Sequence, residues 1–194
     1  SAYGIDVVNS SDGSINNITG NADNYNATQL SGGGVYGIYV SNSPRINVTD
    51  SNLEGGVWTK GIVYYNSSNG SILTNNVFSI GSGLYIGYRS NNSHIMNNDI
   101  TISGSRAIIM SGSSNSNITN NNFTTGDDSG MYLQSSSNNT ISNNNISSVD
   151  RWGLSIYSSS SDNNITNNNI SAGLDFGIEI ALGSNNNNIL NNNI

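Results

Sequence analysis

The chain has 194 residues, of which only 34% are hydrophobic and 9% charged, a polarity typical of disorder unless the apolar residues are regularly spaced. Its net charge of −7, from five basic and twelve acidic residues, leaves little to neutralise a phosphate backbone, so nucleic acid is not an expected partner. No apolar run approaches the roughly 20 residues of a membrane-spanning helix, so no transmembrane segment is expected. Because there is no cysteine, packing and hydrogen bonds must hold the fold.

The first 34 residues are the least regular part of the chain. Gly4-Ile5-Asp6-Val7 opens a pattern of glycine, apolar, any residue, apolar, but residues 21–34 insert a polar, glycine-rich stretch. A repeat protein needs a cover for the open strands at its end. We therefore expect one domain over residues 1–194, with residues 1–34 as an irregular N-terminal coil and cap, and residues 35–194 as regular coils.

Two columns of apolar residues repeat from residue 35 onward. The glycine-led pattern returns at Gly37, Gly61, Gly83, Gly130, Gly153 and Gly177, with Ala107 replacing the glycine once. In the other column, two apolar residues lie five positions apart, at Val48 and Leu53, Leu73 and Phe78, Ile95 and Ile100, Ile118 and Phe123, Ile141 and Ile146, Ile165 and Ile170, and Ile189 and Ile194. Successive units are therefore about 22 to 25 residues long.

This repeat length fits strands and excludes helical repeats. Each unit alternates apolar and polar residues with period two and carries no apolar stripe of helical period. Short strands that stack in register once per unit form a parallel β-helix, in which each coil rises one strand spacing. The sequence predicts an all-β, right-handed parallel β-helix (solenoid) of about eight coils.

Asparagine recurs between the paired apolar residues of each unit. Examples are Asn97-Asn98, Asn120 to Asn122 and Asn143 to Asn145. Asparagine tolerates the left-handed αL conformation at a turn, and its amide can bond to the asparagines of neighbouring coils. We expect a stacked asparagine ladder at a corner of the coil, with a structural role.

These motifs resemble the right-handed parallel β-helix repeat superfamily, which includes pectate-lyase-like and NosD-like repeats. The Asn-Asn-x-Ile variant, with its excess of serine and asparagine, most resembles the repeats of surface-layer and adhesin-like proteins of methanogenic archaea. The resemblance covers about residues 35–194. It implies the fold but leaves function open, because the superfamily contains lyases, hydrolases, epimerases, adhesins and structural proteins.

The outward positions of the glycine-led strands carry several tyrosines. Rings in adjacent coils would form an aromatic stripe, which suits a docking face for a neighbouring protein, a sugar-stacking platform or a solvated surface ladder. The candidate binding or assembly residues are Tyr39, Tyr65, Tyr85, Tyr88, Tyr132, Tyr157, Trp58 and Trp152.

The connector before each glycine carries most of the charge. Arg106, Asp127, Asp128 and Arg151 would lie within one or two strand spacings, and they are the candidate catalytic residues, although no family motif surrounds them. An exposed charge ladder is the alternative, so enzymatic activity stays uncertain. His94 is the single histidine, so no metal site is expected; calcium is the one cofactor that these carboxylates could hold.

Location and function follow from the fold, the aromatic stripe and the sequons. We expect an extracellular or cell-surface structural protein that self-associates into a homo-oligomer or polymer through its tyrosines or through an open last coil at Ile194. The alternative is a carbohydrate-binding or polysaccharide-cleaving module with a polysaccharide partner. Candidate glycosylation sites are Asn17, Asn47, Asn66, Asn91, Asn117, Asn138 and Asn164.

Overall fold

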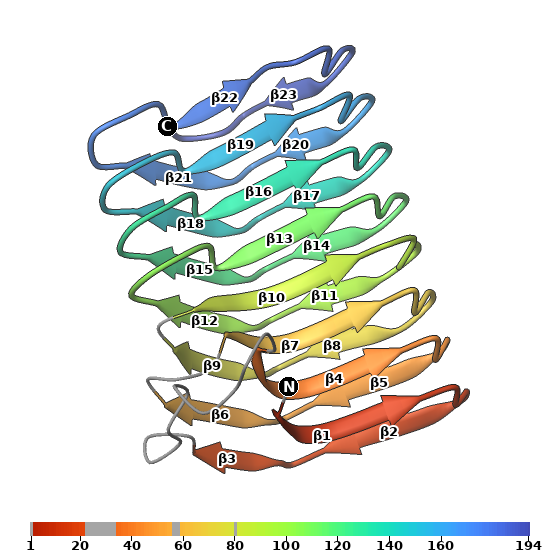
Figure 1. Ribbon diagram of the computed structural model, residues 1–194. Coiled ribbons are helices and arrows are strands. Elements are labelled where there is room, and N and C mark those ends of the chain that lie inside the picture. The colour runs from red at the N-terminus through yellow and green to blue at the C-terminus, as the bar shows by residue number, and fades with distance from the viewer. Residues whose placement is uncertain (1, 22–33, 56–58, 80) are drawn as a thin grey trace.

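The computed structural model describes residues 2–21, 34–55, 59–79 and 81–194, and it shows a right-handed parallel β-helix (Figure 1). Three parallel sheets run along the solenoid, and each coil contributes one strand to each sheet in turn. The described residues form strands, turns and bends, and none of them lies in a helix that could cross a membrane. The predicted fold class is confirmed.

The three sheets are named here in the order in which the chain visits them. Sheet A contains β1 (Ala2–Val8), β4 (Val35–Ser41), β7 (Lys60–Tyr65), β10 (Ser82–Gly87), β13 (Ile108–Ser111), β16 (Met131–Gln134), β19 (Leu154–Tyr157) and β22 (Ile178–Ile180). Sheet B contains β2 (Gly13–Asn16), β5 (Ile46–Thr49), β8 (Ser71–Leu73), β11 (His94–Met96), β14 (Asn117–Thr119), β17 (Thr140–Ser142), β20 (Asn164–Thr166) and β23 (Asn188–Leu190). Sheet C contains β3 (Thr19–Asn21), β6 (Asn52–Gly55), β9 (Asn76–Ser79), β12 (Asp99–Ile102), β15 (Asn122–Thr125), β18 (Asn145–Ser148) and β21 (Asn169–Ala172).

The number of coils differs slightly from the expected eight. Sheets A and B have eight strands each, but sheet C has seven, so seven coils contain all three strands. The first coil is regular: β1, β2 and β3 pair in parallel with β4, β5 and β6. The polar insertion that we expected to form a cap falls mostly on residues 22–33, outside the described residues.

The core is a stack of inward-pointing aliphatic side chains. Ile38, Ile62, Leu84 and Ile108 follow one another on sheet A and are completely buried. Sheets B and C contribute similar columns, of which Ile95 and Ile118 on sheet B are an example. Burial of this stack compensates for the low overall hydrophobicity, because the few apolar residues are concentrated where neighbouring coils meet.

One coil corrects the predicted apolar column. Val48 pairs with Ile72 rather than with Leu73, and Leu53 pairs with Val77 rather than with Phe78. Ile72 and Val77 are completely buried, whereas Phe78 is 53% exposed. The sequence places two apolar residues side by side at both points, and only the pairing with the coils above and below decides which of them points inward.

The predicted asparagine ladder lies at the corner between sheets B and C. The buried side chains of Asn98, Asn121 and Asn144 donate from Nδ2 to the Oδ1 of the next ladder residue, at 2.9 to 3.0 Å. The αL conformation falls on the preceding residue of each coil, such as Asn120 with φ 58°. The turn and the ladder therefore use different asparagines, since a side chain that must point inward is not the one whose backbone reverses.

A second ladder, built from serines, lies at the corner between sheets A and B. The backbone N–H of each buried serine donates to the Oγ of the serine one coil further along, at 3.0 to 3.2 Å between successive members of the ladder. The members are Ser43, Ser67, Ser90, Ser113, Ser136, Ser160 and Ser184. This ladder was not predicted from the sequence, because serine is so frequent in the chain that its repetition carries little signal.

Candidate functional site

The outer face of sheet A carries most of the tyrosines, and a local irregularity at the glycine column decides which residues reach it. The register of β4 and β7 pairs Tyr36 with Lys60 and Ile38 with Ile62, with no pair at the intervening glycines. Gly37 and Ile38 are both buried, whereas Tyr36 and Tyr39 are both half-buried and in ring contact. The strand therefore departs from strict alternation, and Tyr36 joins the outer face.

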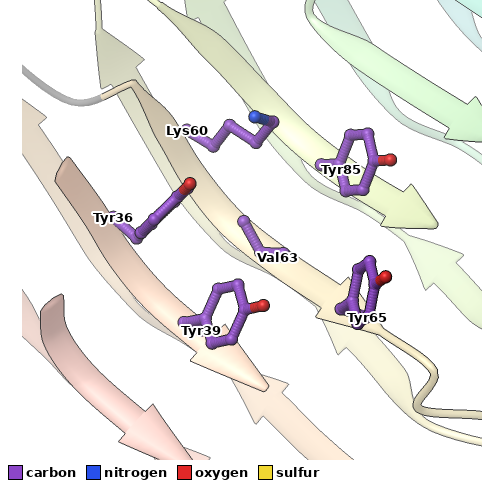
Figure 2. Close-up of a pocket in the computed structure, with 6 residues that line it drawn as sticks. All are labelled: Tyr36, Tyr39, Lys60, Val63, Tyr65 and Tyr85. Carbon is purple, nitrogen blue, oxygen red and sulfur yellow. The ribbon is translucent and has the colours of Figure 1, made fainter. Parts of the chain in front are cut away.

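A hollow of about 200 Å³ lies on this face over β4, β7 and β10 (Figure 2). We call it the Lys60 pocket. Val63 points outward but is only 2% exposed, so it forms the floor beneath the surrounding side chains. The lining residues are Tyr36, Tyr39, Lys60, Val63, Tyr65 and Tyr85.

Lys60 is the cation of this pocket. Its Nζ lies 5.0 Å from the centre of the Tyr85 ring and 5.7 Å from that of Tyr36, so the ammonium group contacts two π faces. Burial lowers the pKa of the Lys60 amine below its usual value. The aromatic rings stabilise the charge only partly, because they replace water without supplying a counter-ion.

A second hollow of about 480 Å³ adjoins the first and shares Tyr65 and Tyr85 with it. We call it the Tyr88 pocket. Tyr65 and Tyr88 stack in parallel, with ring centres 5.0 Å apart and an interplanar angle of 3°. The lining residues are Tyr65, Tyr85, Tyr88, Arg89, Ser111, Gly112, Gln134 and Ser135.

The orientation of Tyr85, which separates the two pockets, depends on a glycine. A Cβ on Gly87 would lie 2.2 Å from Cε1 of Tyr85. The Tyr85 ring therefore lies across the Gly87 backbone, and any residue with a side chain at position 87 would displace it. On the far side of the Lys60 pocket, Tyr3, Tyr36 and Tyr39 form a cluster with ring centres 5.1 to 5.4 Å apart. Burial raises the pKa of Tyr39 above its usual value, so the hydroxyl stays protonated.

In the C-terminal half of the same face, the aromatic and charged side chains pack against one another. The Arg106 guanidinium lies 4.0 Å from the centre of the Tyr132 ring and forms an ion pair with Asp128 at 2.8 Å. The Tyr132 and Tyr157 rings are tilted and 6.1 Å apart, and a hydrogen bond to Glu179 raises the pKa of Tyr157. These side chains contact one another in a row, and they take no part in lining either pocket.

The candidate catalytic residues are only partly brought together. Arg106 and Asp128 form the ion pair described above, and Asp128 Oδ1 also accepts the backbone N–H of Ser129 at 2.8 Å. Asp127 and Arg151 are exposed, and the Arg151 guanidinium lies over the ring of Trp152, at 5.0 Å. Two of the four candidate catalytic residues, Arg106 and Asp128, thus neutralise each other's charge. This favours a structural role for both.

The structure also places the other predicted site residues. Tyr39, Tyr65, Tyr85 and Tyr88 line the two pockets, whereas Tyr132 and Tyr157 form a separate pair. Trp58 lies outside the described residues, and Trp152 is half-buried with its Nε1 unpartnered. None of the seven candidate glycosylation sites is buried, and their modification stays a prediction.

Among the lining residues that the sequence did not predict, Tyr36 and Lys60 were missed for different reasons. Strict alternation from Tyr39 would direct Tyr36 into the core, and the irregularity at Gly37 reverses that direction. In the sequence, Lys60 is one of the charged residues that precede the glycine column, directly before Gly61. Its position as the rung partner of Tyr36 and Ser82 becomes visible only once the strands are paired.

Fold and site together define the class: a right-handed parallel β-helix with an aromatic, cationic hollow on one sheet. The family model described as periplasmic copper-binding protein (NosD) matches residues 1–174 and 125–194, and the chain belongs to this family. Among curated proteins no relative matches.

Two solved structures share the fold. DFA-IIIase from Arthrobacter chlorophenolicus A6, in complex with DFA-III, superposes with a TM-score of 0.65 at 18% identity, over 81% of this chain and 39% of that one. The A-module of the mannuronan C-5 epimerase AlgE4 from Azotobacter vinelandii gives 0.56 at 12% identity, over 95% of this chain and 70% of that one. The chain thus spans about two fifths of the length of the first structure.

The donor set of this chain does not fit the copper site that the family description implies. Copper prefers imidazole, thiolate and thioether ligands, but the chain has one histidine and no cysteine. His94 and Met96 share the outer side of β11, where His94 is exposed and Met96 half-buried, so they offer only two such donors, while Met110 and Met131 are completely buried in the core. Within the described ranges, no three His, Cys, Asp or Glu side chains gather closely enough to hold a metal ion.

Proposed function

We propose that this protein is a carbohydrate-binding β-helix that works outside the cytoplasm and holds a polysaccharide on its tyrosine face. The tyrosine face comprises Tyr36, Tyr39, Tyr65, Tyr85 and Tyr88, which border the two adjoining pockets. Sugar rings present apolar C–H faces that pack on aromatic rings, and hydroxyl groups that bond to polar side chains at the rim. The periplasmic description of the family supports a location beyond the cytoplasmic membrane.

The observation that carries this proposal is the strained backbone of Tyr88. Its φ is 52°, an αL conformation that costs a bulky residue about 1 to 2 kcal/mol. The corresponding positions of the adjacent coils hold Asn66 and Gly112, residue types that adopt αL readily, whereas Ser135, Ser158 and Leu182 take the same conformation further along the solenoid. A tyrosine in this conformation therefore lowers the stability of the fold. The same conformation holds its ring 56% exposed and stacked flat on the ring of Tyr65.

The structural neighbours are consistent with the proposal. One was solved with DFA-III bound, and the other is named for its action on mannuronan. At identities of 18% and 12% the likeness extends only to the fold, so the tyrosine face of this chain is what supports the proposed function.

The test is retention on immobilised polysaccharides. Wild-type protein is compared with Tyr88→Ala, and with Phe78→Ala as the matched control, since Phe78 is an equally exposed ring on sheet C, away from the pockets. We expect Tyr88→Ala to weaken binding about tenfold or more, the equivalent of about 1.4 kcal/mol, and Phe78→Ala to bind as wild type does. Wild-type affinity in Tyr88→Ala, or no retention of wild type on any polymer, would contradict the proposal.

Self-association through the same face is the competing prediction. Sedimentation of wild type and Tyr88→Ala over a range of concentrations separates the two functions. A monomer that binds polysaccharide supports the carbohydrate role. A wild-type polymer that Tyr88→Ala dissociates would replace it with a structural role at the cell surface.

A further inference from the structure

Lys60 differs from the other cations of the described chain in being half-buried without an acidic partner. Arg45 forms an ion pair with Asp12, and Arg106 forms one with Asp128 at 2.8 Å. Arg89 and Arg151 are exposed to solvent. The contacts of Lys60 are with the rings of Tyr36 and Tyr85.

Arg106 provides the comparison on the same face of sheet A. Both cations lie over a tyrosine ring, but Arg106 also has a carboxylate within hydrogen-bonding distance. The chain has twelve acidic residues against five basic ones, so acidic side chains are abundant. Nevertheless the linings of the Lys60 and Tyr88 pockets include Lys60 and Arg89 and no Asp or Glu.

An ammonium group in this position has lost part of its hydration without gaining a counter-ion. Burial lowers its pKa, which means that the site penalises the positive charge in the ligand-free protein. An anionic group that enters the pocket would remove this penalty and gain an ion pair in a partly desolvated hollow, where attraction exceeds that at an open surface.

The two pockets are arranged for a polymer. They share Tyr65 and Tyr85 as a common wall, so successive units of a chain can occupy them while stacking on these rings. Figure 2 shows the Lys60 side chain pointing towards Tyr85. Arg89 places a second cation in the Tyr88 pocket.

We propose that the ligand of the tyrosine face is an anionic polysaccharide, and that the Lys60 ammonium binds its carboxylate or sulfate groups. This inference rests on the proposed carbohydrate-binding function and names the chemical class of its ligand. Lys60 acts as the specificity determinant: the tyrosines supply affinity for sugar rings of any kind, and the ammonium selects those that carry a negative charge.

The test compares three polymers on three proteins. A polyuronate, a sulfated polysaccharide and a neutral glucan are titrated with wild type, Lys60→Met and Arg45→Gln. Methionine keeps an unbranched side chain between the two rings and removes the charge, while Arg45 is a cation on an exposed loop that takes no part in either pocket. Circular dichroism and urea unfolding of both variants check that the fold is unchanged.

We expect Lys60→Met to weaken binding of the anionic polymer about tenfold and to flatten its dependence on salt, while Arg45→Gln leaves both unchanged. Lowering the pH to about 3 separates the two anions, because carboxylates then begin to protonate while sulfates stay charged.

Two other results overturn the inference in different ways. If the neutral glucan binds as tightly as the anionic polymers and Lys60→Met changes nothing, the charge selectivity is wrong and the carbohydrate-binding function stands. If wild type binds none of the three polymers, the proposed function fails together with the inference.

Discussion

Three consecutive asparagines at the corner between sheets B and C have different structural roles. In one coil, Asn120 takes the αL conformation, Asn121 is buried in the ladder, and Asn122 bonds to Asp99 on the outside at 2.8 Å. Only the middle residue satisfies buried backbone groups: its Nδ2 also donates to the carbonyl of Ile95 at 2.9 Å. Identical residues therefore differ in energetic importance according to the direction in which they point.

This division predicts unequal effects of alanine substitution. Asn121→Ala removes the acceptor of the buried backbone N–H of Asn98 and one hydrogen bond to the carbonyl of Ile95 inside the solenoid, so we expect a loss of at least about 2 kcal/mol of unfolding free energy. Asn122→Ala removes hydrogen bonds that water can replace, and should cost under about 1 kcal/mol. Urea unfolding of both variants measures the difference; equal losses would contradict the assignment.

A buried tyrosine makes stability depend on alkaline pH. Tyr64 is completely buried, its hydroxyl donates to the carbonyl of Ile46 at 2.6 Å, and burial raises its pKa far above the ordinary value of 10. The unfolded chain loses this proton near pH 10 while the folded protein keeps it, so the stability is complete below pH 10 and falls above it. In Tyr64→Phe the decline above pH 10 should be smaller. An unchanged slope of stability against pH would show that another group is responsible.

At the scale of the element, the glycine column sets how closely sheet A approaches sheet C. A Cβ on Gly83 would lie 2.2 Å from Cγ2 of Ile100 and 2.5 Å from the carbonyl oxygen of Ala107. Gly61, Gly130 and Gly153 likewise meet a β-branched side chain of sheet C. The coil that carries Ala107 has Phe123 at this position of sheet C, and phenylalanine has no methyl group on its Cβ to occupy that space.

Gly83→Ala should therefore destabilise the protein by about 1 to 3 kcal/mol through overpacking. The double variant Gly83→Ala with Ile100→Phe copies the natural pairing of the next coil and should recover part of that loss, giving a favourable coupling in a double-mutant cycle. Thermal or urea unfolding of the four proteins provides the cycle. Purely additive effects would refute the steric explanation.

At the scale of the molecule, stability resides in contacts between neighbouring coils. Each strand pairs only with its equivalents one coil away, and the ladders connect the same neighbours. A solenoid of this kind is approximately a sum of coils and interfaces. Its length can change by whole coils, but a partial coil would bring outward residues opposite inward ones.

Deletion of residues 140–163 removes one whole coil and joins Asn139 to Asn164, which reproduces the natural Asn163–Asn164 junction. We expect a folded protein with an unchanged circular dichroism signature and a lower urea m-value, because less surface is buried. Both pockets lie outside the deleted segment, so polysaccharide binding should persist. Deletion of residues 140–151, half a coil, should abolish folding; a stable half-coil variant would contradict the repeat register.

The sequence by itself determined the solenoid, its glycine column and the asparagine corner. Each coil repeats the same environment, so a residue type required there recurs at a fixed interval and can be read without coordinates. The same logic gave the outward positions of Tyr39, Tyr85 and Tyr132, which the strand register confirms. It could not choose between Ile72 and Leu73, because alternation fixes a phase only where apolar residues are not adjacent.

Only the tertiary structure decided what gathers on the outer face of sheet A. Tyr36 reaches it through the irregularity at Gly37, Tyr88 through a strained turn, and Lys60 through its pairing with the coils on either side. The irregularity and the αL turn recur in several coils, but a tyrosine or lysine stands at these positions in single coils, so the side chains of the face leave no periodic signal in the sequence. A repeat specifies the environment that all coils share, whereas a binding site is made where individual coils depart from it, and contacts between coils determine the result.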